Sequence, residues 1–220
     1  MPQVNTLKRR VSKPDAPTTR RGELRREGLL KAAREVFLEK GYAAASVEDV
    51  VSRVGGSKAT LYSYFGNKEG LFDDMIGGLC DELRSQLAIP REVEGDLELT
   101  LTRFGKRMLK NFLDPDRVAM HRAIFAEAYK FPQLAQRIYE SGPQRGAQEF
   151  SLFLRRQHEA GVLHCPDPEN AAICFSEMIK ASPQRRAMLG LPVFKNDREM
   201  EKFVGTAVRI FLNGCLPVKK

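Results

Sequence analysis

Length, composition and charge exclude several classes of protein before any motif is considered. The chain has 220 residues, enough for one or two domains with a stable core, and its 36 basic and 28 acidic residues give a net charge of +8. Its four cysteines lack CxxC spacing, which is typical of free thiols in a reducing cytosol. The polar, basic N-terminus is unlike a secretory leader, and no apolar run reaches the length of a membrane span. We therefore expect a cytoplasmic protein with no metal and no membrane partner.

The positive charge is concentrated near the N-terminus. Residues 1–26 contain eight basic and two acidic residues, so +6 of the total lies there, whereas residues 27–70 hold six of each. Residues 1–21 contain three prolines and show no hydrophobic periodicity, which predicts an arm without fixed structure of its own. Such an arm attracts the phosphate backbone of nucleic acid without reading its sequence, and a solvated tail is the alternative interpretation.

Four helices are predicted between the arm and Pro90. The first covers about residues 22–40, has apolar side chains at helical spacing, and ends at Gly41, a natural C-terminal stop. Asn67 can cap the fourth helix, whose apolar stripe covers residues 72–87 before Pro90 stops it.

The second and third helices are separated by a tight glycine turn. The apolar face of the second helix consists of Val47, Val50, Val51 and Val54. Ser46 precedes that face and Asp49 lies three residues further on, which predicts a capping box. Gly55 and Gly56 then break the helix, and Ser57 can cap the next one. Two short helices around such a turn are typical of a helix-turn-helix, whose second helix lies in the major groove of DNA.

The third helix is expected to present a polar face outward. Its Leu61 and Phe65 belong to the core, which leaves hydroxyl, phenol and ammonium groups to contact phosphates and base edges. Backbone N–H groups at three capped helix starts are further phosphate sites. The predicted DNA-binding residues are Ser46, Gly56, Ser57, Lys58, Ala59, Thr60, Tyr62, Ser63, Tyr64, Asn67 and Lys68. A half-buried core position is the alternative for either tyrosine taken alone.

Beyond Pro90, every well-patterned segment is helical. The segments cover residues 97–108 and 118–128, a stretch from near Pro143 to Gly161, one that begins at Pro168, and residues 197–213. No window alternates like a strand. The predicted fold is therefore all-α, an N-terminal three-helix unit followed by a C-terminal helical bundle, with about nine helices in total.

Aromatic and methionine side chains are frequent in this C-terminal half. A helical bundle rich in them can enclose an apolar cavity for a ligand. The candidate ligand-binding residues are Phe104, Met108, His121, Phe125, Phe150, Phe153, Phe175 and Met178. An ordinary packed core is the alternative, and for the histidine a satisfied core position. The spacing of His158, His164 and Cys165 matches no zinc site.

The stretch from residue 33 to residue 72 resembles the DNA-binding domain of the TetR family of transcriptional regulators. The matching positions are Phe37, Lys40-Gly41-Tyr42, Ser46, Val47-Glu48-Asp49-Val50, Gly55, Ser57-Lys58, Thr60-Leu61-Tyr62-Ser63-Tyr64-Phe65 and Lys68-Glu69-Gly70-Leu71-Phe72. Two positions depart from the family pattern: Val54 replaces a small alanine, and Gly56 replaces an apolar residue. We expect the two adjacent glycines to loosen the turn.

The resemblance implies a homodimeric regulator, often a repressor, in the bacterial cytosol or nucleoid. It implies release from a palindromic operator in double-stranded DNA when a small, partly apolar molecule binds the C-terminal domain. It also implies DNA contacts at the positions that match the family motif. These are Ser46, Lys58, Thr60, Tyr62, Tyr64 and Lys68.

A fainter resemblance covers residues 125–161, where AEAYKFPQLAQRIYESGP and LRRQHEAGVL are similar to the C-terminal domain of AefR-like members. The family also implies that the last two helices form the dimer interface. The candidate interface residues are Phe203, Val204, Ala207, Val208, Ile210 and Phe211. Burial in the core of the monomer is the alternative for these six.

Three parts are expected: a basic arm (1–21), a helix-turn-helix domain (22–77) and a ligand-binding and dimerisation domain (78–220). The leading hypothesis is a sequence-specific transcriptional regulator, and the alternative is an architectural protein that binds DNA by charge alone. The sequence contains no GxSxG, no phosphate-binding glycine loop and no HExxH motif. We therefore predict neither enzymatic activity nor a cofactor.

Overall fold

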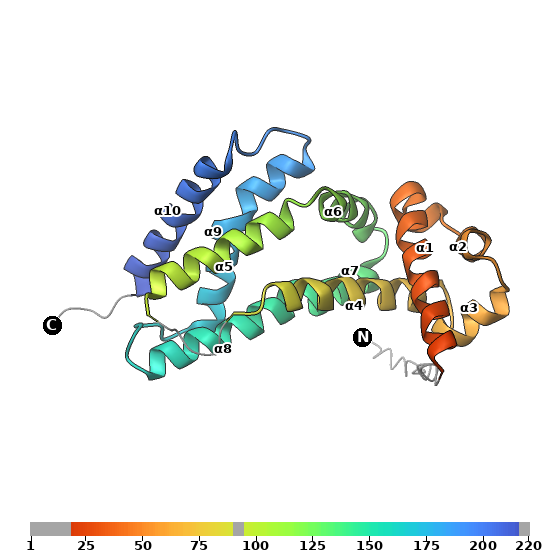
Figure 1. Cartoon of the computed structure of the whole chain (residues 1–220), viewed down its shortest axis with the longest axis horizontal. Helices are drawn as coiled ribbons and strands as arrows, with labels where there is room; N and C mark the ends of the chain where they lie inside the picture. The colour runs from red at the N-terminus through yellow and green to blue at the C-terminus, as the bar shows by residue number, and fades with distance from the viewer. Residues whose placement is uncertain (1–18, 90–94, 216–220) are drawn as a thin grey trace, which may run out of the picture. The chain divides into compact units, whose positions relative to one another are not determined.

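The computed structural model describes residues 19–89 and 95–215, and every regular element in these ranges is helical (Figure 1). In chain order the elements are α1 (Arg20–Ala44), α2 (Val47–Val54), α3 (Lys58–Phe65), α4 (Lys68–Gln86), α5 (Leu97–Phe112), α6 (Pro115–Ala128), α7 (Pro132–Tyr139), the π-helical turn η1 (Glu140–Gln144), α8 (Arg145–Glu159), α9 (Pro168–Met188) and α10 (Asp197–Cys215). The all-α prediction is confirmed. The described residues divide into two compact units, a first unit up to residue 75 without residues 41–43, and a second unit of residues 41–43 with those from 76 onward.

The first unit, described from residue 19, is built on the apolar faces of α1, α2, α3 and the start of α4. Buried side chains at helical spacing line α1. Gly41 interrupts the helical geometry as expected, with a backbone φ of 75°, and α1 continues beyond this kink to Ala44. Leu61 and Phe65 of α3 are buried, as predicted. Phe72 of α4 meets Phe37 of α1 edge to face, with ring centroids 5.2 Å apart.

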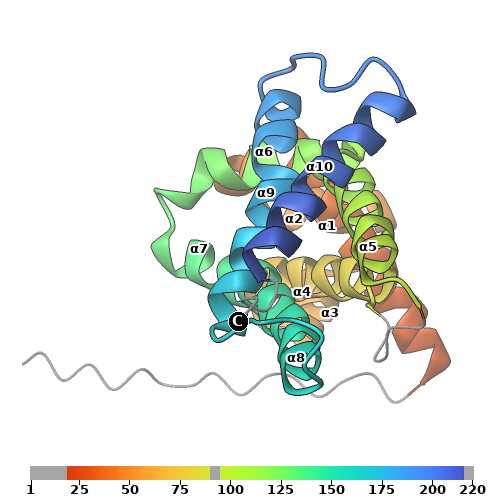
Figure 2. The same cartoon turned by 90° about the vertical axis from the view of Figure 1, so that its left-hand side faces the viewer.

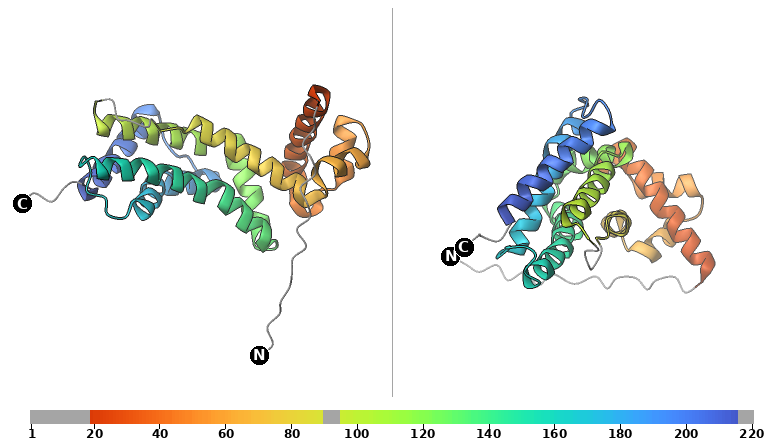
Figure 3. Two further views of the ribbon diagram at one scale, coloured as in Figure 1. Left: turned by 90° about the horizontal axis from the view of Figure 1, so that it is seen from below. Right: turned by 60° about the vertical axis from the view of Figure 1, so that its left-hand side comes forward.

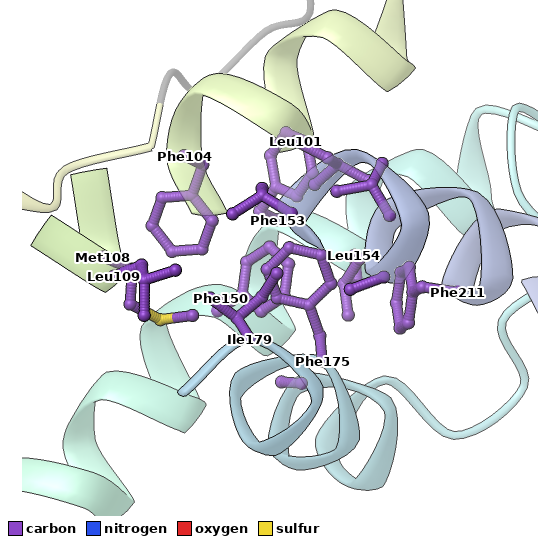
Figure 4. Packing of buried hydrophobic residues seen from close by; sticks show 14 of the residues in the cluster. Leu101, Phe104, Met108, Leu109, Phe150, Phe153, Leu154, Phe175, Ile179 and Phe211 are labelled. Carbon is purple, nitrogen blue, oxygen red and sulfur yellow. The ribbon is translucent and has the colours of Figure 1, made fainter. Parts of the chain in front are cut away.

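The core of the second unit lies between α5, α8, α9 and α10, and α9 packs against the other three (Figure 2). The centre of the core is aromatic. Figure 4 shows Phe104, Phe150 and Phe175 together, and each pair of their ring centroids lies 5.0 to 6.0 Å apart. The ring of Phe211 of α10 packs against Phe175 from another side, with ring centroids 5.0 Å apart.

The segment from α7 to α8 differs from the predicted one (Figure 3). We expected a helix to begin near Pro143, but this proline lies inside η1, between α7 and α8. A proline lacks the N–H group of an α-helical hydrogen bond and its ring crowds the preceding turn, so the wider π turn accommodates it. Helix α7 was not predicted. Helix α4 ends at Gln86, and Pro90, its expected stop, lies outside the described residues.

We predict that Phe153→Ala lowers the free energy of unfolding by about 3–5 kcal/mol, because it leaves a cavity in a fully packed core. Phe153 is completely buried, and its ring centroid lies 5.9 Å from that of Phe150. Urea denaturation of the full chain measures the change. Leu152→Ala is the matched control, because Leu152 is 53% exposed on the same helix. Equal losses for the two variants would contradict the packing described here.

Candidate nucleic-acid interface

Helix α2 begins with the predicted capping box. The Asp49 N–H donates to Ser46 Oγ (3.1 Å), and the Ser46 N–H donates to Asp49 Oδ2 (2.9 Å). Lys40 Nζ donates to Asp49 Oδ1 at 2.6 Å. This hydrogen bond, followed by those from Ser46, lowers the pKa of Asp49 from its ordinary 3.8 to about 2. The carboxylate is therefore ionised at the positive end of the α2 dipole, which it stabilises.

The turn between α2 and α3 uses both glycines in conformations that other residues rarely adopt. Gly55 has φ 71° and Gly56 has φ 113°. We expected adjacent glycines to loosen this turn, but the structure supplies a partner that the sequence pattern did not reveal. Arg25 of α1 donates from Nη1 to the Val54 carbonyl (3.2 Å) and from Nη2 to the Gly55 carbonyl. Because Arg25 lies 30 residues before Gly55 in the chain, no local sequence pattern predicted this contact.

The other departure from the family pattern, Val54, has a partner in a glycine of α1. A Cβ atom on Gly28 would lie 3.4 Å from Val54 Cγ1. The missing side chain at residue 28 therefore leaves room for a valine where the family usually has alanine.

Helix α3 is capped at both ends. The Thr60 N–H donates to Ser57 Oγ (3.2 Å) at its start, and the Ser57 and Thr60 hydroxyls lie 3.0 Å apart. At its end, the Gly66 N–H donates to the Tyr62 carbonyl (2.8 Å). The next cap is Asn67, whose Oδ1 accepts from the Gly70 N–H (2.7 Å) at the start of α4. Eight residues of helix are thus held between two defined ends.

The exposed side of α3 carries most of the predicted DNA-binding side chains. Lys58, Ala59, Tyr62 and Ser63 are exposed, whereas Thr60 and Tyr64 are half-buried. Tyr62 is 45% exposed, and Lys58 forms an ion pair with Glu48. Gly56, Ser57 and Asn67 are also exposed, while Ser46 and Lys68 are half-buried. This surface combines hydroxyl, phenol and ammonium donors with one small residue, which suits contact with phosphates and base edges.

The predicted ligand-binding residues fall into two groups. Phe104, Met108, Phe150, Phe153 and Phe175 belong to the buried core cluster, and Met178 packs at its edge. His121 and Phe125 lie apart from it. Phe125 is 63% exposed, and the half-buried His121 has Nδ1 2.8 Å from the Arg117 carbonyl.

The predicted dimer-interface residues are largely buried within the single chain. Val204, Ala207, Val208 and Phe211 lie in the core cluster, because α10 packs against α5 and α9. Phe203 is half-buried against the same cluster, and Ile210 is 60% exposed. For the four buried residues, the structure therefore supports the alternative of a monomer core.

No group of three His, Cys, Asp or Glu side chains in the described ranges is placed to hold a metal ion. None of the helices described is long and apolar enough to cross a membrane.

Comparison with known proteins identifies the family. Residues 29–75 match bacterial regulatory proteins of the tetR family, and residues 99–214 match the C-terminal domain of AefR-like transcriptional repressors. The chain belongs to the TetR family. It is a transcriptional regulator that binds DNA through the helix-turn-helix of α2 and α3, and it is not an enzyme.

Relatives and solved structures agree with this assignment. The chain is 32% identical to the Flavonoid-responsive Regulator FrrA, with a TM-score of 0.81, covering 90% of this chain and 100% of that one. A putative TetR-family regulator from Mesorhizobium loti gives 25% identity and a TM-score of 0.79 with the same coverage. The Bacillus subtilis regulator YvkB is 25% identical over 84% of this chain and 94% of its own length. The transcriptional activator FasR of Mycolicibacterium smegmatis is 37% identical, but the match spans only 43% of its length and 37% of this chain.

We predict that the ionised Asp49 stabilises the first unit above about pH 4 and loses this effect as the pH falls toward 2. The sign follows from a folded-state pKa below the ordinary value, because the folded state then resists protonation more than the unfolded chain does. Urea denaturation of wild type and Asp49→Asn at a series of pH values tests this. The difference in unfolding free energy should shrink across that interval, and a constant difference would contradict the role of the carboxylate.

Proposed function

We propose that this regulator is a homodimeric repressor, that it reads a palindromic operator with α3, and that it leaves the operator when a small molecule binds. The observation that carries the proposal is the α3 surface. Its two capped ends hold a short helix whose exposed side presents donors for phosphates and base edges. The DNA-contacting residues we propose are those predicted from the sequence, with Lys58, Tyr62 and Ser63 the exposed polar side chains on α3 itself.

Repression is favoured over activation by the C-terminal half. The residues matching the AefR-like repressor domain make up more than half of the chain, whereas the activator FasR is similar over less than half of it. Whether such a regulator represses or activates also depends on the position of its operator in the genome. A cytosolic or nucleoid location follows from the proposed function.

A dimer gives α3 the geometry that a palindrome requires. Two copies related by a two-fold axis must place their reading helices about 34–36 Å apart, or a multiple of it, to meet successive major-groove faces. For the dimer contact we propose the solvent-facing sides of α9 and α10. These retain exposed apolar side chains, including Ile173 and Ile210, that the monomer core does not bury.

For the effector we propose a flat aromatic molecule with phenolic hydroxyl groups. FrrA is described as flavonoid-responsive, and this chain is similar to it over nearly its whole length. The described residue that suits a phenol is His121. The Arg117 carbonyl can only accept a hydrogen bond, so at 2.8 Å the His121 Nδ1 carries the proton and Nε2 is left as an acceptor.

The surroundings of His121 favour the same ligand class. Burial lowers the pKa of His121; the hydrogen bond to the Arg117 carbonyl partly opposes this and the positive charges of Lys180 and Arg117 add to it, so the ring is neutral at neutral pH. Its centroid lies 5.9 Å from that of Phe112, and Lys180 Nζ lies 5.6 Å from the Phe112 centroid. A neutral acceptor beside an aromatic ring suits an aromatic molecule with hydroxyl groups, while the Lys180 ammonium is paired with Glu177.

The first experiment is selection of random duplex DNA by the purified protein at moderate salt. We expect an enriched palindrome, whereas binding without preference that vanishes as salt rises would support the architectural alternative. Tyr62→Phe and Tyr64→Phe should each weaken binding to the enriched duplex by about 3–10-fold, because each removes one hydroxyl donor. Tyr139→Phe is the matched control, an exposed tyrosine in the second unit. Unchanged affinity for both α3 variants would contradict the proposed orientation of α3.

Effector coupling is tested by titrating flavonoids into the protein with and without the enriched duplex. A molecule that releases the protein must bind the DNA-free state more tightly, so equal affinities would rule out the release mechanism. His121→Phe should weaken flavonoid binding at least tenfold while leaving duplex affinity unchanged. His164→Phe is the control, because His164 is an exposed histidine in the same unit. Loss of binding in both variants would contradict the proposed role of His121.

A further inference from the structure

The turn before α3 leaves helix-end carbonyls that its own glycines do not satisfy. The last carbonyls of an α-helix lack intrahelical partners, and a glycine in the left-handed helical conformation usually supplies the cap. Gly55 instead has φ 71° and ψ 162°, outside that conformation. The carbonyls of Val54 and Gly55 accept hydrogen bonds from Arg25.

The Arg25 side chain also fills the space beside Gly56. A Cβ atom on residue 56 would overlap Arg25 Nη2, and its three nearest neighbours would all be atoms of the guanidinium group. A Cβ atom on Gly55 would meet nothing within 4 Å. The glycine at 56, where the family usually has a larger apolar residue, therefore leaves the space that the Arg25 side chain occupies.

The neighbouring arginine contacts the opposite end of α3. Arg26 Cζ lies 5.3 Å from the centroid of the Phe65 ring, and Arg26 forms an ion pair with Asp74 of α4. Two consecutive residues of α1 thus contact the residues that precede α3 and the last residue of α3. These contacts are hydrogen bonds at the turn before α3 and a cation–π contact at its last residue.

We propose that Arg25 is a positioning residue for DNA reading, and that Arg25 and Gly56 act as one unit that sets the direction in which α3 leaves the turn. This inference rests on the proposed function, because it assumes that α3 reads the operator. The guanidinium is occupied by two carbonyls in the free protein, so its contribution is to hold the turn and not to neutralise a phosphate. A direct phosphate contact by Arg25 is the competing explanation.

The test compares Arg25→Gln and Arg25→Lys with Arg21→Gln, a control that removes the same charge from an exposed position on α1. We expect Arg25→Gln to lose at least about tenfold in affinity for the duplex that wild type enriches, the equivalent of one charge-assisted hydrogen bond. Affinity for an unrelated duplex and the slope of log affinity against log salt should stay at their Arg21→Gln values. Arg25→Lys should also lose affinity, because an ammonium lacks the fork that reaches two carbonyls.

Gly56→Ala gives an independent check of the Arg25–Gly56 unit. The added methyl strains a backbone with φ 113° and also displaces the guanidinium, so the combined loss in the double variant should be smaller than the sum of the losses from Arg25→Gln and Gly56→Ala. Additive losses would contradict the coupling. A salt slope smaller by about one in Arg25→Gln than in Arg21→Gln, with full affinity retained by Arg25→Lys, would overturn the proposal in favour of a phosphate contact.

Hydrogen exchange on the DNA-free protein separates this inference from the proposed function. If Arg25 holds the turn, the amides of Thr60 and Leu61, which donate to the Ser57 carbonyl just after the turn, should exchange at least about tenfold faster in Arg25→Gln than in wild type or Arg21→Gln. Unchanged exchange would overturn the positioning role. If wild type enriches no duplex but the exchange result holds, the proposed function fails while the contact that orders the turn stands.

Discussion

A helix-turn-helix must satisfy the carbonyls at the end of its first helix without lengthening the turn to its second. In this protein the requirement is met from outside the motif, by the Arg25 guanidinium on α1. Everything that α3 presents outward depends on this junction, because a small rotation at the turn moves each of its side chains relative to a major groove. The caps at Ser46, Ser57 and Gly66 define where the helices begin and end. Arg25 and Arg26 of α1 define the direction of α3.

Most of the first unit could be predicted from the sequence because its signals are local. The valine pattern of α2, its capping box, the Ser57 cap and the stop at Gly41 each depend on residues a few positions apart. The Arg25 contact could not be predicted, since nothing within a helical turn of Arg25 reports a carbonyl 30 residues later. In the sequence, Gly56 was visible only as a departure from an apolar family position, from which we expected a looser turn.

The second unit was less predictable, since the faces of its helices are chosen by packing and not by local pattern. Helix α10 carries apolar residues around much of its circumference, and the sequence alone leaves open whether they meet a second copy or the same chain. The fold buries Val204 and Val208 and leaves Ile210 exposed. Likewise Phe125 continues the helical pattern of α6 but lies in solvent, and Pro143 resembles a helix start but lies within a π turn. For α10 and Phe125 the packing of the whole unit selects the buried face, and for Pro143 the chemistry of the proline ring favours the π turn.

Charge distribution explains why orientation matters so much in this regulator. Residues 27–70 carry six positive and six negative side chains, so the motif itself gains little from non-specific attraction to DNA. Of the eight basic residues before them, Arg25 and Arg26 are engaged within the first unit. The other six lie in residues 1–21, the predicted arm that we expect to attract phosphates without distinguishing one duplex from another. Discrimination must come from the hydrogen bonds of α3, which weaken steeply with distance and angle. A DNA-binding motif without net charge thus depends on the precision with which α1 holds α3, more than a strongly basic motif would.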